Sequence, residues 1–277
     1  MNNLHRELAP ISNAAWEQID EEAARTLKRF LAARRVVDVH GPHGLDFSAV
    51  GTGHTETIDG PSAGAILRGP AIFAVRREAQ RLVELRVPFE LTRQAIDDVE
   101  RGALDADWDT LKEAARQIAY AEDGAVFDGY AAAGIGGIRG GASTNPVALP
   151  SDVMHYPEAV AAAVDELRLA GVDGPYCLVL GGAAYRAMSG GSDEGYPVIQ
   201  HVQRLVDGDI VWAPAIEGGL VVSTRGGDFA LDLGQDLSIG YLGHSAQTVT
   251  LYLQESFTFR LLTTEAAVDL SPDTLGA

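Results

Sequence analysis

The chain has 277 residues, of which 46% are hydrophobic, so it can bury one large core or two smaller ones. Its formal net charge of −18 argues against nucleic acid as a partner, because phosphate binding needs concentrated Lys and Arg. No apolar run approaches the ~20 residues of a membrane span, the first residues lack a signal-peptide pattern, and the single cysteine cannot form an internal disulfide. We therefore expect a cytoplasmic protein with no membrane partner.

The N-terminal quarter predicts a helix, a short strand and an arm. Apolar residues recur every three or four positions over 13–35, which predicts an amphipathic helix capped by Ser12 or Asn13. A strand at 36–39 and a turn at 41–44 follow. Residues 45–76 have many glycines and little aliphatic periodicity, so they can bury little of themselves. We interpret them as an extended β-hairpin arm that leans on a neighbouring subunit, with a mobile surface loop as the alternative.

The middle of the chain alternates helices and strands. Residues 81–91 predict a strand, Thr92 can cap a short helix ending at 101–102, and a longer helix is expected over 109–132. The glycine-rich run 134–141 then predicts a flexible connection. Beyond it we expect a helix over 157–170, a buried strand over 176–180, a short helix over 183–188, an exposed loop over 189–195 and a helix through 205.

The last quarter is rich in β-structure. Five segments predict strands, at 209–213, 219–223, 228–233, 237–241 and 248–261. Short strands separated by glycine signals imply an antiparallel sheet, and the RGGD sequence at 225–228 is expected to be a turn between two of them. The fold class is therefore α+β.

Candidate chemical motifs are weak. The run 134–141 fails the dinucleotide pattern because Arg139 stands where the third glycine belongs. His40 and His43, with Asp38 nearby, could bind a metal only with a further ligand, and solvated turn histidines are the simpler interpretation. Cys177 lies in an apolar strand, where thiols are inert. No nucleophile elbow or P-loop is visible, so we expect no catalytic residues, no metal site and no enzyme activity.

Segments spread over nearly the whole chain resemble the type 1 encapsulins, a bacterial family that also includes linocin-type bacteriocins, and the composition is similar to that of its actinobacterial members. The segments are 8–10 (LAP), 16–20 (WEQID), 37–39 (VDV), 41–42 (GP), 97–102 (DDVERG), 171–176 (GVDGPY), 195–197 (GYP), 225–228 (RGGD), 235–241 (QDLSIGY) and 253–259 (LQESFTF). Each motif alone is weak, but together they keep the family's order.

The resemblance implies the fold of a tailed-bacteriophage major capsid protein, with a peripheral domain, an axial domain and an extended β-hairpin arm. The implied divisions are 1–44 (an N-terminal interior helix and the start of the peripheral domain), 45–76 (the arm), 77–132 (peripheral domain), 133–222 (axial domain) and 223–277 (C-terminal strands of the peripheral domain). It also implies an icosahedral homo-oligomer of on the order of 60 copies or a multiple.

Two surfaces follow from the same resemblance. A groove for the C-terminal targeting peptide of a cargo protein is implied at Leu27, Phe30, Leu31, Arg34, Asp38, Val39, Leu237, Ile239, Gly240 and Tyr241, where Arg34 and Asp38 would set the direction of the peptide. A five-fold pore loop is implied at Ser189, Gly190, Gly191, Ser192, Asp193, Glu194, Gly195 and Tyr196, with a narrow, negatively lined opening. The alternatives are that the apolar stripe is simply core and that the loop is an ordinary solvated one.

The expected cargo is a dye-decolorizing peroxidase, with a ferritin-like protein as second choice, which would place the shell in oxidative-stress defence or iron storage. Some relatives bind a flavin through an aromatic residue that corresponds to Gln94 here, near Arg86, so we expect no cofactor. Two other functions remain as alternatives: a secreted bacteriocin or protease-like protein, and a phage capsid subunit.

Overall fold

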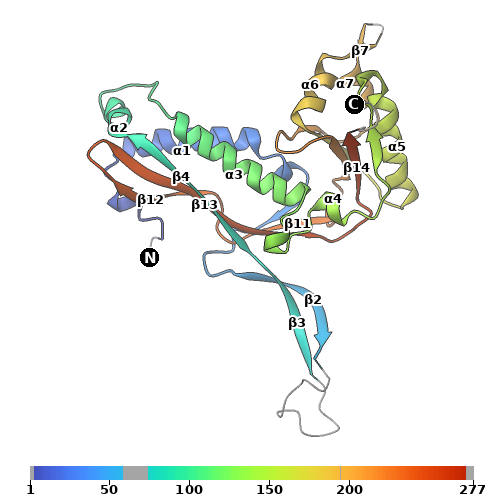
Figure 1. The fold of residues 1–277 in the computed structure, drawn as a ribbon, viewed down its shortest axis with the longest axis horizontal. Helices are drawn as coiled ribbons and strands as arrows, with labels where there is room; N and C mark the ends of the chain where they lie inside the picture. The colour runs from blue at the N-terminus through green and yellow to red at the C-terminus, as the bar shows by residue number, and fades with distance from the viewer. Residues whose placement is uncertain (1–2, 59–73, 194, 273–277) are drawn as a thin grey trace.

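The computed structural model describes residues 3–58, 74–193 and 195–272, which form two lobes and a projecting hairpin (Figure 1). Each lobe is built on a five-stranded sheet within these residues. The first lobe carries the helices α1, α2 and α3, and the second carries α4 to α7. No helix in the described ranges is long and apolar enough to cross a membrane.

The long strand β13 (Thr248–Leu261) organises the sheet of the first lobe. Strand β4 (Val83–Thr92) pairs antiparallel along one side of it, and β11 (Phe229–Leu233) and β12 (Ser238–His244) follow one another along the other side. Strand β1 (Asp38–His40) then pairs with β11 in parallel. The antiparallel pairing predicted for the C-terminal strands is confirmed for β11, β12 and β13, whereas the predicted strand at 209–213 pairs in parallel with the strand at 176–180 in the second lobe.

Three helices pack on the sheet of the first lobe. They are α1 (Asn13–Phe30), α2 (Arg93–Glu100) and α3 (Asp109–Phe127), preceded by a short 3-10 helix, η1 (Arg6–Leu8). The predicted caps are confirmed, because Ser12 Oγ accepts a hydrogen bond from the Ala15 amide at 3.2 Å and Thr92 Oγ1 accepts one from the Ala95 amide at 3.1 Å. The first helix ends earlier than predicted, at Phe30, and a 3-10 turn, η2 (Ala33–Arg35), follows it.

The sheet of the second lobe has the order β5 (Val147–Leu149), β14 (Ala267–Pro272), β10 (Gly219–Ser223), β6 (Tyr176–Leu180) and β9 (Ile210–Trp212). Its helices are η4 (Val153–His155), α5 (Tyr156–Leu169), α6 (Gly182–Gly190) and α7 (Val198–Gln203). The expectation that every strand after residue 223 joins the peripheral sheet is wrong for β14. This strand pairs with β10 and buries Ala267, Val268 and Leu270 in the second lobe.

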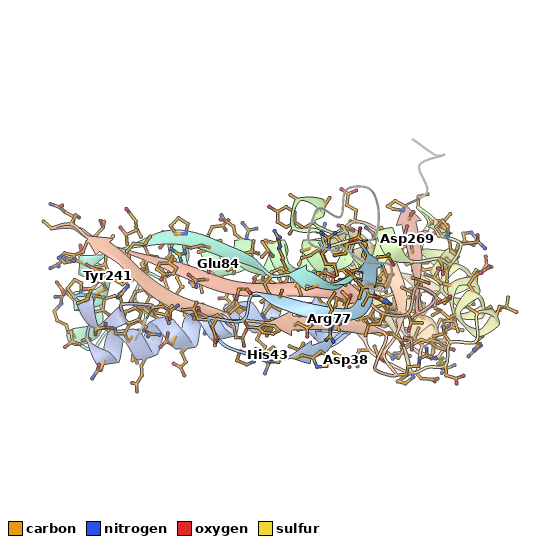
Figure 2. All side chains as sticks on the ribbon, turned by 90° about the horizontal axis from the view of Figure 1, so that it is seen from below. Asp38, His43, Arg77, Glu84, Tyr241 and Asp269 are labelled. Carbon is orange, nitrogen blue, oxygen red and sulfur yellow. The ribbon has the colours of Figure 1, made fainter. Side chains whose placement is uncertain are left out.

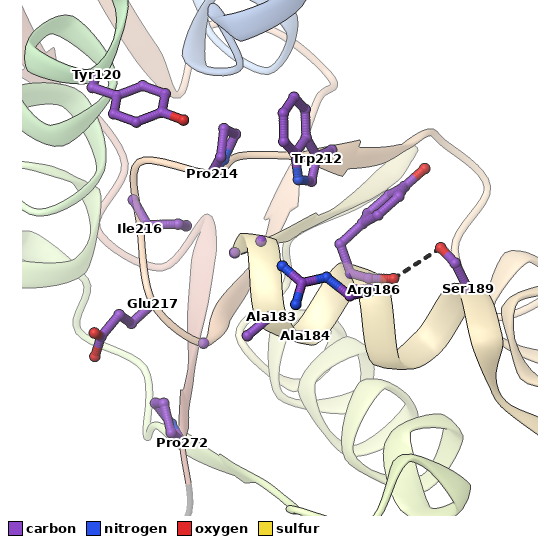
Figure 3. Close-up of a pocket in the computed structure, with 14 residues that line it drawn as sticks. Tyr120, Ala183, Ala184, Arg186, Ser189, Trp212, Pro214, Ile216, Glu217 and Pro272 are labelled. Atoms are coloured by element: carbon purple, nitrogen blue, oxygen red, sulfur yellow. Dashed lines mark hydrogen bonds between the residues drawn. The ribbon is translucent and has the colours of Figure 1, made fainter. Parts of the chain in front are cut away.

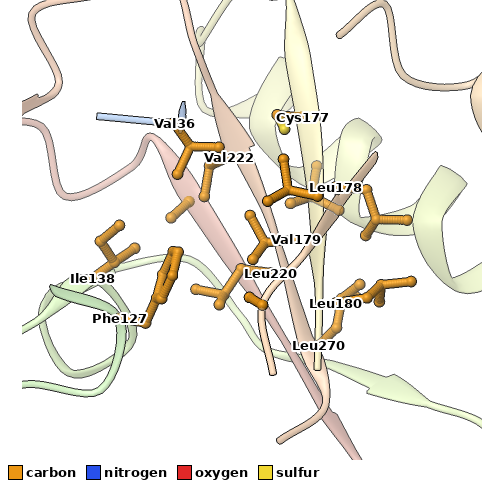
Figure 4. Packing of buried hydrophobic residues seen from close by; sticks show 14 of the residues in the cluster. Val36, Phe127, Ile138, Cys177, Leu178, Val179, Leu180, Leu220, Val222 and Leu270 are labelled. Carbon is orange, nitrogen blue, oxygen red and sulfur yellow. The ribbon is translucent and has the colours of Figure 1, made fainter. Parts of the chain in front are cut away.

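The two lobes share one apolar core at their junction. Phe127 at the end of α3 and Ile138 of α4 (Ile138–Gly141) lie in the same buried cluster as Leu178 and Leu220 of the second sheet (Figure 4). The predicted helix over 109–132 ends at Phe127, and a 3-10 turn, η3 (Ala131–Ala133), follows.

The glycine-rich run after α3 is not the flexible connection that we predicted. Ile135 and Ile138 are fully buried, and the Arg139 guanidinium donates to Asp269 Oδ1 at 2.6 Å and to the Glu217 carbonyl at 2.9 Å. Buried apolar anchors and a bound guanidinium hold this segment against both lobes.

Gly137 is the most constrained glycine of this junction. Its φ and ψ of 72° and 169° lie in a region that only glycine occupies readily, and a Cβ there would lie 2.4 Å from the Gly129 amide nitrogen. We expect Gly137→Ala to lower the free energy of unfolding by about 3 kcal/mol, measured by thermal unfolding with circular dichroism.

Gly134→Ala is the matched control, because Gly134 has a similar φ of 73° but a Cβ added there would meet no atom of the described residues within 4 Å. It should cost about 1 kcal/mol, from backbone strain alone. Equal losses for the two variants would contradict a tightly packed junction.

The projecting hairpin consists of β2 (Ala49–Thr57) and β3 (Val75–Arg81), which confirms the predicted hairpin arm in the described residues. Strand β3 continues to Arg81, beyond the arm boundary predicted at 76. Neither apolar core includes a residue of these two strands, and their side chains are half-buried or exposed. The hairpin extends away from both lobes in Figure 1, so its own subunit gives it little to pack on.

Candidate functional site

Six of the ten predicted cargo residues belong to one apolar cluster in the first lobe. Leu27 and Ile239 are buried members of it, while Phe30, Leu31, Leu237 and Tyr241 border it and are half-buried. These six come from α1 and its C-terminal end, and from β12 and the bend before it. The structure therefore brings the apolar part of the predicted groove together, and it assigns Leu27 and Ile239 to the core.

Phe30 lies where the first lobe meets the second. Its ring packs against Tyr120 at 5.8 Å and against Trp212 at 5.6 Å between centroids. Tyr120 and Trp212 also line a cavity of about 790 Å³ whose other walls come from α6 and the segment after β9 (Figure 3). Phe30 thus helps to position α1 against the second lobe.

Strand β12 is partly covered by the N-terminal segment. The Tyr241 amide donates to the Leu4 carbonyl at 2.8 Å, and the Tyr252 hydroxyl reaches the Asn3 carbonyl at 3.4 Å. Gly240 serves the packing of Tyr252, because a Cβ at this position would lie 2.1 Å from Tyr252 Cζ. Since neighbouring residues of a strand face opposite sides of the sheet, Gly240 and Tyr241 do not present one surface.

Asp38 and Val39 lie on β1, at the edge of the same sheet. Asp38 Oδ2 accepts a hydrogen bond from the Gly227 amide at 2.6 Å, and Val39 is 40% exposed. In Figure 2, Asp38 and Tyr241 are well separated along the long axis of the molecule. The ten predicted residues therefore do not surround one compact pocket, and they form an apolar part near α1 and a separate edge at β1.

Arg34 is held inside a cluster of carboxylates. Its guanidinium donates to Glu122 of α3 at 2.5 Å, to Asp236 at 2.7 Å and to Glu255 of β13 at 3.1 Å. Both glutamates are fully buried, whereas the Arg34 side chain is 18% exposed. Its donors are engaged by carboxylates of its own subunit, two of them buried and the third, Asp236, 45% exposed, so Arg34 is not free to orient a bound peptide directly.

The neighbouring Asp123 holds the turn that follows α1. Its carboxylate accepts hydrogen bonds from the Ala32 amide at 3.0 Å and from the Ala33 amide at 2.9 Å. Burial raises the pKa of Asp123 to about 7, although the two amides act in the opposite direction. Burial and the charge of Glu122 likewise raise the pKa of Glu255 well above its ordinary value.

The sequence reasoning missed Glu122, Asp123 and Glu255, although a signal exists for two of them. Glu122 continues the buried helical stripe of Ile118 at a spacing of four, and Glu255 continues the alternation of Leu251 and Leu253 along β13. An acidic residue at a position that periodicity assigns to the core needs a cationic partner. Arg34 is that partner, and pairing it with these two glutamates required the tertiary structure.

The predicted pore loop is a helix end followed by a small hairpin. Ser189 and Gly190 are exposed as predicted, but they belong to α6 rather than to a loop. The Ser189 hydroxyl donates to the Tyr185 carbonyl at 2.8 Å, as helix-terminal serines often do. Strands β7 (Ser192–Asp193) and β8 (Tyr196–Pro197) then pair at the tip of the second lobe (Figure 1). Glu194 lies outside the described residues.

The base of this small hairpin carries basic and aromatic groups. The Tyr196 ring packs on His201 at 4.6 Å, and its hydroxyl accepts a hydrogen bond from Arg204 at 2.7 Å. Gly195 has a φ of +87°, which a turn residue between two strands requires.

The remaining motifs of the sequence have structural roles. The Cys177 thiol is buried and donates to the Asp209 carbonyl at 2.9 Å, and burial raises its pKa to about 12, as expected for an inert core thiol. The His43 ring packs on Phe47 at 4.4 Å, and the described residues contain no group of three or more side chains placed to hold a metal ion. Arg86 stacks on Tyr252 at 4.4 Å, and the turn at 225–228 is closed by an Arg225–Asp228 ion pair.

Comparison with known proteins adds to this geometry. Residues 1–258 match the family Linocin_M18, described as encapsulating protein for peroxidase. The type 1 encapsulin shell protein of Rhodococcus erythropolis is 55% identical over 271 residues, which cover 98% of this chain and all of that one. This relative matches nearly the whole length of the chain, and it carries the name of a shell protein rather than of an enzyme.

Solved structures show the fold. A virus-like particle from Pyrococcus furiosus aligns with a TM-score of 0.65 at 15% identity, over 92% of this chain and 99% of that one. The capsid of Myoviridae phage XM1 aligns with a TM-score of 0.53 at 10% identity, over 87% and 92% of the two chains. The predicted capsid-type α+β fold is confirmed by these alignments, and the prediction of a structural protein rather than an enzyme is confirmed by the sequence relatives.

Proposed function

Because this chain belongs to the type 1 encapsulin shell proteins, we propose that its copies close into an icosahedral nanocompartment, of about 60 copies or a multiple, around a cargo enzyme. The β2–β3 hairpin is the observation that supports this best, since neither core of its own subunit includes it. An isolated two-stranded ribbon is marginally stable in water, so a neighbouring subunit is its natural support. The particle would be cytoplasmic, in keeping with one free buried cysteine.

Size-exclusion chromatography followed by negative-stain microscopy tests this proposal. The purified protein should elute far ahead of a 29.3 kDa monomer and appear as closed, uniform particles. A folded monomer at every protein and salt concentration would rule out the shell.

For the cargo, a dye-decolorizing peroxidase is our first choice and a ferritin-like protein our second, each held by its C-terminal tail. The family description names peroxidase, which supports the first choice. The half-buried side chains of Phe30, Leu31, Leu237 and Tyr241 offer apolar contacts to an extended peptide, and the exposed edge at Val39 offers another. We assign Arg34 a positioning role, because it holds the turn after Leu31 through the carboxylates beneath it.

We expect Val39→Asp to abolish cargo capture and to leave the shell intact, because Val39 is 40% exposed on an edge strand and contributes little to either core. The measurement is co-purification of a fluorescent protein that carries the C-terminal tail of a dye-decolorizing peroxidase. A tailless fluorescent protein gives the background.

Leu169→Asp is the matched control, since Leu169 is 84% exposed at the end of α5 in the second lobe. It introduces the same charge and should capture cargo normally. If Val39→Asp captures cargo normally, β1 does not contribute to the cargo-binding surface.

The small β7–β8 hairpin is our proposal for the five-fold pore, which would admit small molecules and cations and exclude proteins. Its position at the tip of the second lobe supports this assignment (Figure 1). The chain's charge of −18, repeated in every copy, would concentrate cations around such a particle.

A further inference from the structure

Three carboxylates share one guanidinium at the junction between α1, α3 and β13. Arg34 donates to Glu122, Asp236 and Glu255, and the two glutamates have fully buried side chains. Asp236 is 45% exposed, so the buried part of the cluster is Arg34 with the two glutamates, and it would carry a net charge of −1 if all three groups were ionised. Taking uncompensated charge out of water is costly, so a buried cluster of this kind lowers its charge by holding a proton.

The hydrogen bonds show where that proton belongs. Glu255 Oε1 is buried and accepts no hydrogen bond from the described residues, whereas Glu122 receives three from Arg34. Glu122 and Glu255 both accept from the same nitrogen, Arg34 Nη2, so their carboxyl groups are neighbours. Two neighbouring carboxyl groups can share one proton, which leaves the pair with a single negative charge opposite the guanidinium. Asp123 lies next to Glu122 and is satisfied separately by the Ala32 and Ala33 amides.

We infer that Glu122 and Glu255 share one proton at neutral pH, and that its loss at alkaline pH loosens the turn Leu31–Arg35, which connects α1 to the sheet. The cluster of Arg34, Glu122, Asp236 and Glu255, called the latch below, therefore makes the stability of this turn depend on pH. The segment that it affects contains Leu31 and Arg34. In the shell proposed above, a rise in pH would therefore weaken the attachment of α1 to the sheet. The effect on the shell rests on the proposed function, whereas the sharing of a proton between Glu122 and Glu255 does not depend on it.

The sign of the effect follows from linkage. A carboxyl whose pKa is higher in the folded than in the unfolded chain keeps an extra proton in the folded state between those two values. The free energy of unfolding therefore falls as pH rises through that interval. For Glu255 the loss begins above its ordinary pKa of 4.5 and continues to its raised value, and Asp123 adds a loss between 3.8 and about 7.

The test compares wild type with Glu255→Gln, in which a neutral amide replaces the shared acid. Infrared spectra at about pH 8 should show a protonated-carboxyl carbonyl band in wild type that is absent from the variant. Hydrogen exchange at Leu31–Arg35, corrected for intrinsic rates, should lose about tenfold of its protection in wild type between about pH 7 and pH 9, and much less in Glu255→Gln.

Glu113→Gln is the control, because it removes the same charge from an exposed position on α3 and should behave as wild type. Glu122→Gln tests the same proton if Glu255→Gln does not fold. If both glutamine variants keep the band and the pH dependence of wild type, the latch is ruled out. Negative-stain images at neutral pH distinguish failure of the proposed shell from failure of this inference. Missing particles would count against the shell, whereas the infrared spectra test the shared proton independently.

Discussion

Removing the hairpin arm is expected to abolish assembly while the subunit remains folded. In the variant, a two-residue Gly-Ser turn replaces residues 50–80 and joins Ala49 to Arg81, which are paired neighbours across β2 and β3. Among the described residues that the variant removes, 50–58 and 74–80, none belongs to either apolar core, so the thermal unfolding temperature should change little. Chromatography and negative-stain microscopy should show monomers or small open oligomers, because a closed shell needs every inter-subunit contact to be repeated.

Gln80→Ala tests whether assembly is lost because the arm is missing or because a contact of the arm with its own subunit is missing. The Gln80 side-chain amide donates to the Phe259 carbonyl at 2.8 Å, which ties the arm to its own subunit. This variant keeps the arm but removes that hydrogen bond, and it should still assemble. Closed particles formed by the armless variant would show that the arm is dispensable and would remove the main support for the proposed assembly.

Arg34→Ala is expected to lower the free energy of unfolding by about 4 kcal/mol, because breaking a buried ion pair leaves uncompensated charge in the interior. Glu122 and Glu255 would then lie fully buried without this cation. The loss should be larger at alkaline pH, where neither glutamate can remain neutral. Thermal unfolding followed by circular dichroism at two pH values measures both effects.

Arg168→Ala provides the comparison, since Arg168 pairs with Asp165 on the surface of α5 at 3.6 Å and both side chains are more than half exposed. An exposed pair of this kind contributes at most about 0.5 kcal/mol, so the variant should resemble wild type. Similar stabilities for the two alanine variants would mean that the buried carboxylates find compensation elsewhere.

The local elements of this protein could be predicted from the sequence because their signals are local. Ser12 and Thr92 stand directly before periodic apolar stripes, and each caps the helix that it predicts. The glycine-rich arm was expected to be a hairpin from its inability to bury itself, and its strands β2 and β3 pair accordingly. Order-preserving segments from 8–10 to 253–259 carried the family resemblance, and the whole-length match to a shell protein agrees with it.

Tertiary structure alone decided how these elements share their cores. Strand β14, for which no strand was predicted from the sequence, joins the second sheet, where Val268 and Leu270 complete the core. The run 134–141 looked flexible from its glycines, yet Ile135, Ile138 and Arg139 hold it against partners far along the chain. The positions of the predicted cargo residues also depended on tertiary contacts. Arg34 binds the buried Glu122 and Glu255, whereas Val39 lies at an exposed edge. Periodicity reports which face of an element is buried, whereas the identity of the burying partner depends on contacts between residues distant in sequence.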